Sequence, residues 1–162
     1  MSEPVHARQV FSDPIVWLAF GFGSGLAPRA PGTAGTLMAI PLFLLLDQLT
    51  FTGYLLATTF ITLIGVWICG YASRVLGVHD HPGIVWDEFA GFLIAMTAAP
   101  EGWTGIVAGF ALFRLFDIWK PWPVSRADRE VRGGLGIMLD DVLAGLMAAA
   151  VLWSAGVLLA IN

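Results

Sequence analysis

Three long stretches of this chain carry no charged side chain, and they constrain its fold more than any other feature. They run from Ala30 to Leu46, from Phe51 to Ala72 and from Val142 to Asn162, with lengths of 17, 22 and 21 residues. About 20 apolar residues in a helix span the hydrocarbon core of a bilayer. The last two stretches therefore predict membrane-spanning helices, and the first is adequate for one.

The composition supports a membrane location. The chain is 57% hydrophobic and only 12% charged, whereas an average soluble domain is about 25% charged. Its 162 residues predict one domain over 1–162. The net charge of −4 argues against a nucleic-acid partner, which needs a basic patch. Cys69 is the single cysteine, which excludes an intramolecular disulfide. The N-terminal segment lacks the layout of a cleavable signal peptide.

The charges predict an orientation. Five crossings, at 33–49, 53–73, 86–99, 103–118 and 141–161, place every Lys and Arg on or near one side, with only Asp47 and Glu101 on the other. The hairpin over 86–118 spans fully only if flanking residues extend its two short apolar stretches, and the alternative is that the other helices shield it. Positive charge marks the cytoplasmic side of a membrane protein. We therefore expect an all-α, multi-pass helical bundle with about five membrane-associated helices and short interfacial helices, without any internal repeat.

Local signals predict where helices begin and where they pack closely. Asp13 before Pro14 is typical of an N-cap followed by proline in the first turn. Thr33 and Asp140 are candidate caps for the helices that follow them. Small residues at steps of four favour close helix packing, and two such sets occur: Gly105 with Gly109, and Asp141 with Gly145 and Ala149.

The segment HDHPGIVWDEFAG, residues 79–91, contains adjacent carboxylates at Asp87 and Glu88 near a predicted helix start. Adjacent helical residues point roughly 100° apart, so one carboxylate can face a site while the other finds a different partner. The alternative is negative charge that simply stabilises a helix N-terminus.

The segment FRLFDIWKPWP, residues 113–123, places Arg114, Asp117 and Lys120 at steps of three, so we expect them along one helix face. An interfacial salt-bridge ladder flanked by Trp119 and Trp122 explains this pattern without catalysis.

The segment RGGLGIMLDDVLAG, residues 132–145, places Asp140 and Asp141 after three glycines. Carboxylate oxygens suit magnesium, whereas a flexible loop followed by a carboxylate cap is the simpler interpretation.

The glycine-rich segment GFGSGLAPRAPGTAGT, residues 21–36, precedes an apolar helix. It has neither the GK[ST] of a Walker A loop nor a preceding strand, as a dinucleotide fingerprint requires. Backbone N–H groups before a helix can nevertheless bind phosphate. Ser24, Thr33 and Thr36 add hydroxyls and Arg29 adds a cation, although an ordinary turn is equally compatible.

Taken together, these four motifs resemble the phosphatidylglycerophosphatase A family in order and spacing, over about residues 12–160. The resemblance implies a magnesium-dependent enzyme that converts phosphatidylglycerophosphate to phosphatidylglycerol and inorganic phosphate at the bacterial inner membrane.

We assign hypothetical roles within this resemblance. Magnesium binds Asp87, Asp140 and Asp141, with Glu88 and Asp117 as further ligands or nearby support, and Arg114 and Lys120 offset phosphoryl charge. The glycine segment holds the phosphate through Gly23, Ser24, Gly25, Arg29, Gly32, Thr33 and Thr36. Attack by water and attack by an aspartate are both compatible with these residues.

Three other functions stay open, of which the first two fit the sequence less well. A transporter or channel component needs charges near the membrane midplane, whereas these charges gather toward one face. A scaffold that binds anionic lipid needs the basic residues but not the four aspartates on the same side. A phosphatase for another membrane phosphate monoester, such as phosphatidate, differs only in headgroup. The sequence sets no oligomeric state.

Overall fold

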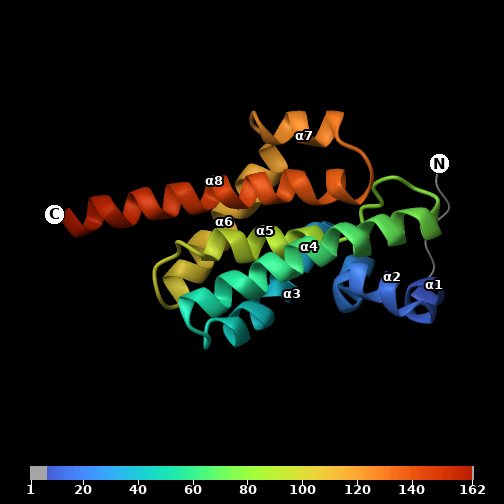
Figure 1. Ribbon diagram of the computed structural model, residues 1–162, viewed down its shortest axis with the longest axis horizontal. Helices are drawn as coiled ribbons and strands as arrows, with labels where there is room; N and C mark the ends of the chain where they lie inside the picture. The colour runs from blue at the N-terminus through green and yellow to red at the C-terminus, as the bar shows by residue number, and fades with distance from the viewer. Residues whose placement is uncertain (1–6, 162) are drawn as a thin grey trace.

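The computed structural model describes residues 7–161, with side chains left out at 9 and 159–161; the expectations that rest on residues 1–6 lie outside this range. The described residues form helices and turns without a strand, which confirms the all-helical prediction (Figure 1). The elements are α1 (Ala7–Ser12), α2 (Pro14–Ala19), the 3-10 helix η1 (Gly21–Leu26), α3 (Pro31–Leu46), α4 (Phe51–Leu76), α5 (Trp86–Met96), α6 (Trp103–Trp119), α7 (Val124–Glu130) and α8 (Gly133–Ile161).

Helix α5 is the centre of the molecule, and α3, α4, α6 and α8 pack around it. It is almost entirely buried; Phe89, Phe92 and Leu93 are fully enclosed. The long helices α4 and α8 run in opposite directions along the length of the molecule, and α8 extends beyond the bundle at its C-terminal end (Figure 1). The short helices α1 and α2 lie near the end where α4 finishes (Figure 1).

Two helices, Phe51–Leu76 and Gly133–Leu158 within α8, are long and apolar enough to cross a membrane. Only 33% of the apolar window of the first and 50% of that of the second is buried. A core helix of a water-soluble protein would be mostly covered, whereas α4 exposes Leu56, Phe60 and Leu63. Apolar side chains therefore face outward along these helices, as they do in lipid.

The segment predicted at 86–99 is a short buried helix, as in the alternative of a hairpin shielded by the other helices. Helix α5 ends at Met96 and has 11 residues, about 16 Å of helix against a hydrocarbon core of about 30 Å. Helix α3 has 16 residues, about 24 Å. Helix α5 is apolar because other helices surround it. The apolar composition of a segment does not by itself distinguish a helix buried among other helices from a helix that faces lipid.

Glycines allow the closest helix contacts. A Cβ at Gly145 of α8 would lie 2.3 Å from the carbonyl oxygen of Gly91 in α5, and one at Gly91 would lie 2.7 Å from the carbonyl oxygen of Asp141. The predicted small-residue face of the last helix is therefore confirmed at Gly145. Gly109 lies against Met96 of α5, whereas Gly105 lies against the carbonyl of Pro100 in the loop between α5 and α6.

One of the three predicted caps is confirmed. The Asp13 side chain accepts hydrogen bonds from the N–H groups of Ile15 and Val16 at the start of α2. Thr33 is not a cap, because α3 begins at Pro31. Asp140 is not a cap either, because α8 begins at Gly133.

The predicted flexible glycine loop before Asp140 is instead the first turn of α8. Gly134 and Gly136 serve close packing, whereas Gly133 has a left-handed φ of 74°. A Cβ at Gly134 would lie 1.9 Å from the carbonyl oxygen of Val66, so glycine is needed where α8 crosses α4.

Candidate active site

Three carboxylates from two helices meet at the N-terminal end of α5. Asp87 and Glu88 lie in the first turn of α5, and Asp141 lies in α8. Each offers an oxygen, and these oxygens lie within 4.8 Å of one another. Asp87 and Asp141 are buried. The close contact of α8 with Gly91 places Asp141 here, so two segments far apart in the sequence form one cluster.

Burial and mutual repulsion make this cluster costly when all three groups are ionised. Burial raises the pKa of Asp87 well above its usual range, and the charges of Glu88 and Asp141 add to the effect. Burial also raises the pKa of Glu88, to about 7. A bound cation removes this repulsion.

The donor set fits a divalent cation such as magnesium. It consists of carboxylate oxygens, which hard cations prefer, and it lies inside the protein. Oε2 of Glu88 is buried and lacks a hydrogen-bond partner among the described residues, which leaves it available as a ligand. Asp87, Glu88 and Asp141 are therefore the residues that would hold the ion.

Arg114 of α6 lies beside the cluster. Its Nη1 atom is 2.6 Å from Oδ2 of Asp117 and 3.7 Å from Oε1 of Glu88. The predicted Arg114–Asp117 contact along one face of α6 is thus confirmed. The Nε atom of Arg114 is buried and has no hydrogen-bond partner in the part of the chain that the structure describes. The Nε–H group of Arg114 is thus available to donate a hydrogen bond to a bound anion.

Lys120 does not continue this face, contrary to the prediction. It follows the last residue of α6 with a left-handed φ of 45°, which turns it away from Asp117. Its Nζ atom donates hydrogen bonds to Asp128 of α7 and to Oδ2 of Asp140, the latter at 2.9 Å. Burial opposes the charge of Lys120, but these two carboxylates outweigh it and raise the pKa of the lysine above its usual value.

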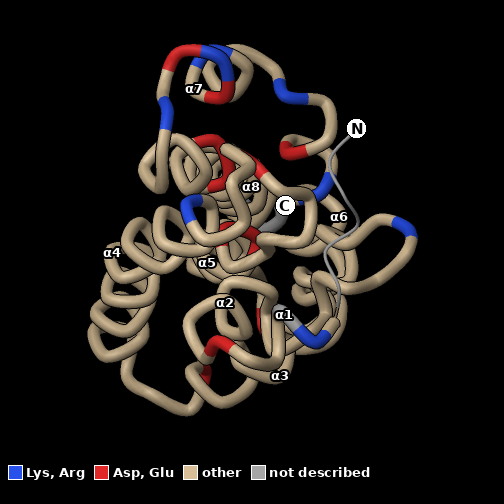
Figure 2. The backbone as a smooth tube through the Cα atoms, turned by 90° about the vertical axis from the view of Figure 1, so that its right-hand side faces the viewer, with Lys and Arg blue, Asp and Glu red and all other residues tan. Residues whose placement is uncertain are grey.

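Asp140 therefore faces Lys120, while its neighbour Asp141 faces α5. Asp128 is a residue that the sequence did not single out, because it lies in the charged segment VSRADRE, which has the appearance of an ordinary solvated helix. Figure 2 shows α7, with its alternating positive and negative residues, above the start of α8.

The first part of the glycine-rich segment has a structural role. Gly23 has a φ of +97°, which other residues rarely adopt. Gly25 packs so tightly that a Cβ there would lie 2.0 Å from the carbonyl oxygen of Gly83. The Ser24 hydroxyl donates to the carbonyl of Phe20 at 3.5 Å, and Arg29 is exposed.

The second part of that segment reaches the carboxylates. A Cβ at Gly32 would lie 2.1 Å from Oε1 of Glu88 and 3.1 Å from Nη1 of Arg114. The N-cap residue of α3 is Ala30, whose side chain cannot accept a hydrogen bond, and no other described side chain caps this helix. The first N–H groups of a helix have no acceptor within it. Gly32 and Thr33 therefore bring free backbone donors to the site, whereas the buried Thr36 hydroxyl donates to the carbonyl of Gly32 at 2.9 Å.

These observations define a class of protein: a helical, membrane-type protein in which buried carboxylates, an arginine and a helix N-terminus converge. Such a site suits the binding of an anion such as phosphate together with a divalent cation. The chain matches the family model described as Phosphatidylglycerophosphatase A over residues 17–155. It belongs to the phosphatidylglycerophosphatase A family.

Two of its curated relatives carry the family name, and a third carries a different one. Phosphatidylglycerophosphatase A of Escherichia coli (strain K12) is 46% identical over 151 residues, covering 93% of this chain and 88% of the relative. The Haemophilus influenzae protein of the same name is 46% identical over 147 residues, covering 88% of each chain. A Bacteroides thetaiotaomicron protein named "Putative phosphatidylinositol-3-phosphatase" is 40% identical over 139 residues, covering 81% of this chain and 86% of the relative. No solved structure matches the chain.

Proposed function

We propose that this protein is a lipid phosphatase that hydrolyses phosphatidylglycerophosphate to phosphatidylglycerol and inorganic phosphate, with magnesium, at the cytoplasmic face of the bacterial inner membrane. The observation that carries the proposal is the cluster of Asp87, Glu88 and Asp141 beside Arg114. Membership of the family supports the same activity.

The terminal phosphate binds beside Arg114 and the start of α3, which lie against each other at Gly32. The N–H groups of Gly32 and Thr33 donate to its oxygens, and the positive end of the helix dipole favours its charge. Arg114 donates to the phosphate through its Nε atom, which has no hydrogen-bond partner among the described residues. Asp117 holds the guanidinium group in place through its ion pair.

The carboxylates act on the phosphate from the third side. Asp87, Glu88 and Asp141 would hold the cation, with Glu88 in the place that the sequence suggested for Asp140. A magnesium ion held by these carboxylates would supply positive charge beside the phosphoryl oxygens and would lower the pKa of a bound water. Asp140 holds Lys120 through their hydrogen bond, and we propose that this second cation offsets the negative charge that develops on the phosphate.

The apolar helices and the charged residues also suggest how the protein lies in the membrane. Helices α4 and α8 cross the bilayer, and the active site lies at the headgroup level on the side rich in Lys and Arg, which is the cytoplasmic side. Trp119 and Trp122 flank Lys120 and are 70% and 75% exposed. Amphipathic rings are enriched at this interfacial level, and a phospholipid phosphate lies at the same level.

The decisive experiment measures phosphate release by the purified protein in detergent. The substrates are phosphatidylglycerophosphate, phosphatidate and phosphatidylinositol 3-phosphate, because one relative is named for a different headgroup. Each is assayed with magnesium and with EDTA. We expect magnesium-dependent release from the first substrate alone. Release from all three would overturn the headgroup assignment, and no release by folded protein would favour a lipid-binding scaffold.

A further inference from the structure

Asp128 of α7 has no role in the proposed function, yet it accepts a hydrogen bond from Lys120. The same ammonium group donates to Asp140 of α8 at 2.9 Å. We propose that Asp128 is a positioning residue for the reaction, which fixes the ammonium group of Lys120 beside Asp140. The inference rests on the proposed function, in which Lys120 offsets the charge that develops on the phosphate.

Helix α7 packs one face against α8, and Asp128 lies on that face. Val124 and Ala127 are buried, with 0% and 6% exposure, and Val124 belongs to the hydrophobic core. Residues three and four positions apart share a helix face, so Asp128 lies on the same side as Val124. Arg126 and Glu130 lie on the opposite side, pair with each other, and have side chains that are 65% and 60% exposed. The charged helix therefore carries one carboxylate toward solvent and another toward the body of the protein.

Three elements hold Lys120. Its backbone N–H donates to the carbonyl of Phe116 at 2.9 Å, which ends α6 with Lys120 in a left-handed conformation. Its Nζ atom then reaches α7 through Asp128 and α8 through Asp140. An ammonium group has three N–H donors, and the two carboxylates use two of them. No third acceptor of Nζ occurs in the described part of the chain, so one donor remains for a bound anion.

Asp140 alone would leave this lysine loosely placed. A lysine side chain has a flexible stem of four carbons, and that of Lys120 is 33% exposed. An ammonium group with a single acceptor can rotate about that hydrogen bond. A second carboxylate fixes a second N–H direction, and therefore also the direction of the third. Because Asp128 and Asp140 come from different helices, the packing of α7 on α8 sets the position of the ammonium group.

The lysine is held on the acidic side of the site. Asp117, which pairs with Arg114, lies close enough to Asp140 and Asp141 for its negative charge to act on both. Lys120 places a positive charge at the Asp140 end of this group, as Arg114 does at the Asp117 end. A change in the position of the ammonium group therefore changes the electrostatic field at the carboxylates and at a phosphate bound beside them.

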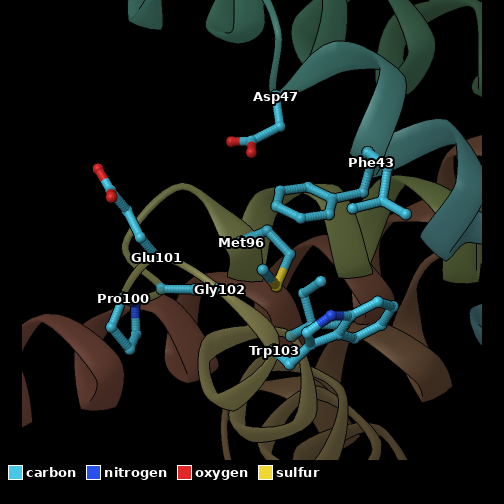
Figure 3. Close-up of a pocket in the computed structure, with 10 residues that line it drawn as sticks. Phe43, Asp47, Met96, Pro100, Glu101, Gly102 and Trp103 are labelled. Carbon is cyan, nitrogen blue, oxygen red and sulfur yellow. The ribbon is translucent and has the colours of Figure 1, made fainter.

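Other acidic residues of this protein lack such a partner. At the opposite end of the bundle, Figure 3 shows Asp47 and Glu101 at a pocket of about 200 Å³. Both residues are exposed, and neither forms an ion pair with a described residue. An exposed position does not by itself supply a carboxylate with a cation, so the bond between Asp128 and Lys120 depends on where α7 packs.

The position of the ammonium group can be tested by NMR without any assay of activity. Lys120 is the only lysine in the sequence, so protein labelled with ¹⁵N-lysine has a single ammonium signal. We expect a sharp signal in the wild type, because hydrogen bonds slow the exchange of its protons with water. Asp128→Asn should broaden or remove it. Glu130→Gln, the matched control on the outer side of the same helix, should keep it. An unchanged signal in Asp128→Asn would overturn the inference.

Kinetics test whether this position matters for the reaction. A misplacement of about 1 Å costs about 10²-fold in rate, and Asp140 still holds the lysine, so we expect Asp128→Asn to lower kcat about tenfold and to change KM less than about twofold. Glu130→Gln should keep the wild-type kcat. In a Lys120→Met background, Asp128→Asn should lower kcat no further, since both changes act through one group.

The outcomes separate the two proposals. Equal losses from Asp128→Asn in the wild-type and Lys120→Met backgrounds would show that Asp128 does not act through Lys120, and would overturn the inference. An equal loss in Glu130→Gln would do the same, because the effect would then belong to the helix and not to this carboxylate. Failure of the folded wild type to hydrolyse phosphatidylglycerophosphate would overturn the proposed function, and with it the effect on the reaction. An unchanged lysine signal would overturn the inference alone.

Discussion

Adding one methyl group at Gly32 tests the architecture of the site directly. In Gly32→Ala the new Cβ would lie 2.1 Å from Oε1 of Glu88, whereas ordinary contact begins at about 3.4 Å. The carboxylate must therefore move by more than 1 Å (3.4 minus 2.1 Å). Arg114 cannot stay in place either, because its Nη1 atom would lie 3.1 Å from the same Cβ.

The effect on catalysis should exceed the effect on stability. A misplacement of about 1 Å costs about 10²-fold in rate, so we expect kcat to fall by about that factor. The atom that must move is the end of a flexible side chain, and alanine favours the helix by about 0.5–1 kcal/mol. Overpacking costs about 1–3 kcal/mol, which leaves a net loss of unfolding free energy of at most about 2.5 kcal/mol.

The assay is phosphate release in mixed micelles, with thermal unfolding of the same preparations. Gly156→Ala in α8 is the matched control, because a Cβ there meets nothing within 4 Å. It should keep wild-type activity and equal or greater stability. A Gly32→Ala protein as active as Gly156→Ala would refute the placement of the start of α3 at the reacting phosphate.

Four further results follow from the same geometry. Asp87→Asn should abolish magnesium-stimulated phosphate release while raising the melting temperature of the cation-free protein, since one of three crowded negative charges is removed; retained release would contradict its role. Arg114→Lys should lower kcat/KM by about 10²-fold, because an ammonium group cannot replace the two-sided contact with Glu88, Asp117 and phosphate. Asp13→Ala should lower the unfolding free energy by about 1 kcal/mol through the lost N-cap and leave kcat unchanged, as chemical denaturation and the release assay can determine. For Glu88, the pKa is raised from 4.5 to about 7 in the folded protein, so the folded state binds the proton more tightly; its stabilising contribution is complete below about pH 4.5 and lost as the pH rises through about 7. Unfolding of EDTA-treated protein across this range should show that decline, and Glu88→Gln should flatten it.

Local chemistry accounts for the features that the sequence predicts correctly. The helical class and the two longest helices follow from charge-free stretches long enough for a bilayer. The N-cap at Asp13 and the pair formed by Arg114 and Asp117 depend only on residues within one helical turn. The same holds for the small-residue face at Gly145, because a step of four puts side chains on one face whatever the surroundings.

The tertiary structure decided which carboxylates meet. Asp140 and Asp141 are adjacent, so they point about 100° apart on α8, and the contact of α8 with Gly91 selects Asp141 to join Asp87 and Glu88. Asp140 instead accepts a hydrogen bond from Lys120. Lys120 also donates to Asp128 of α7, a helix that the sequence did not connect to the site. Gly32 reaches Glu88 only because α3 packs on α5. Except for the pair Lys120–Asp128, each of these contacts joins residues at least 12 positions apart in the sequence. The spacing of residues along one helix carries no information about such contacts.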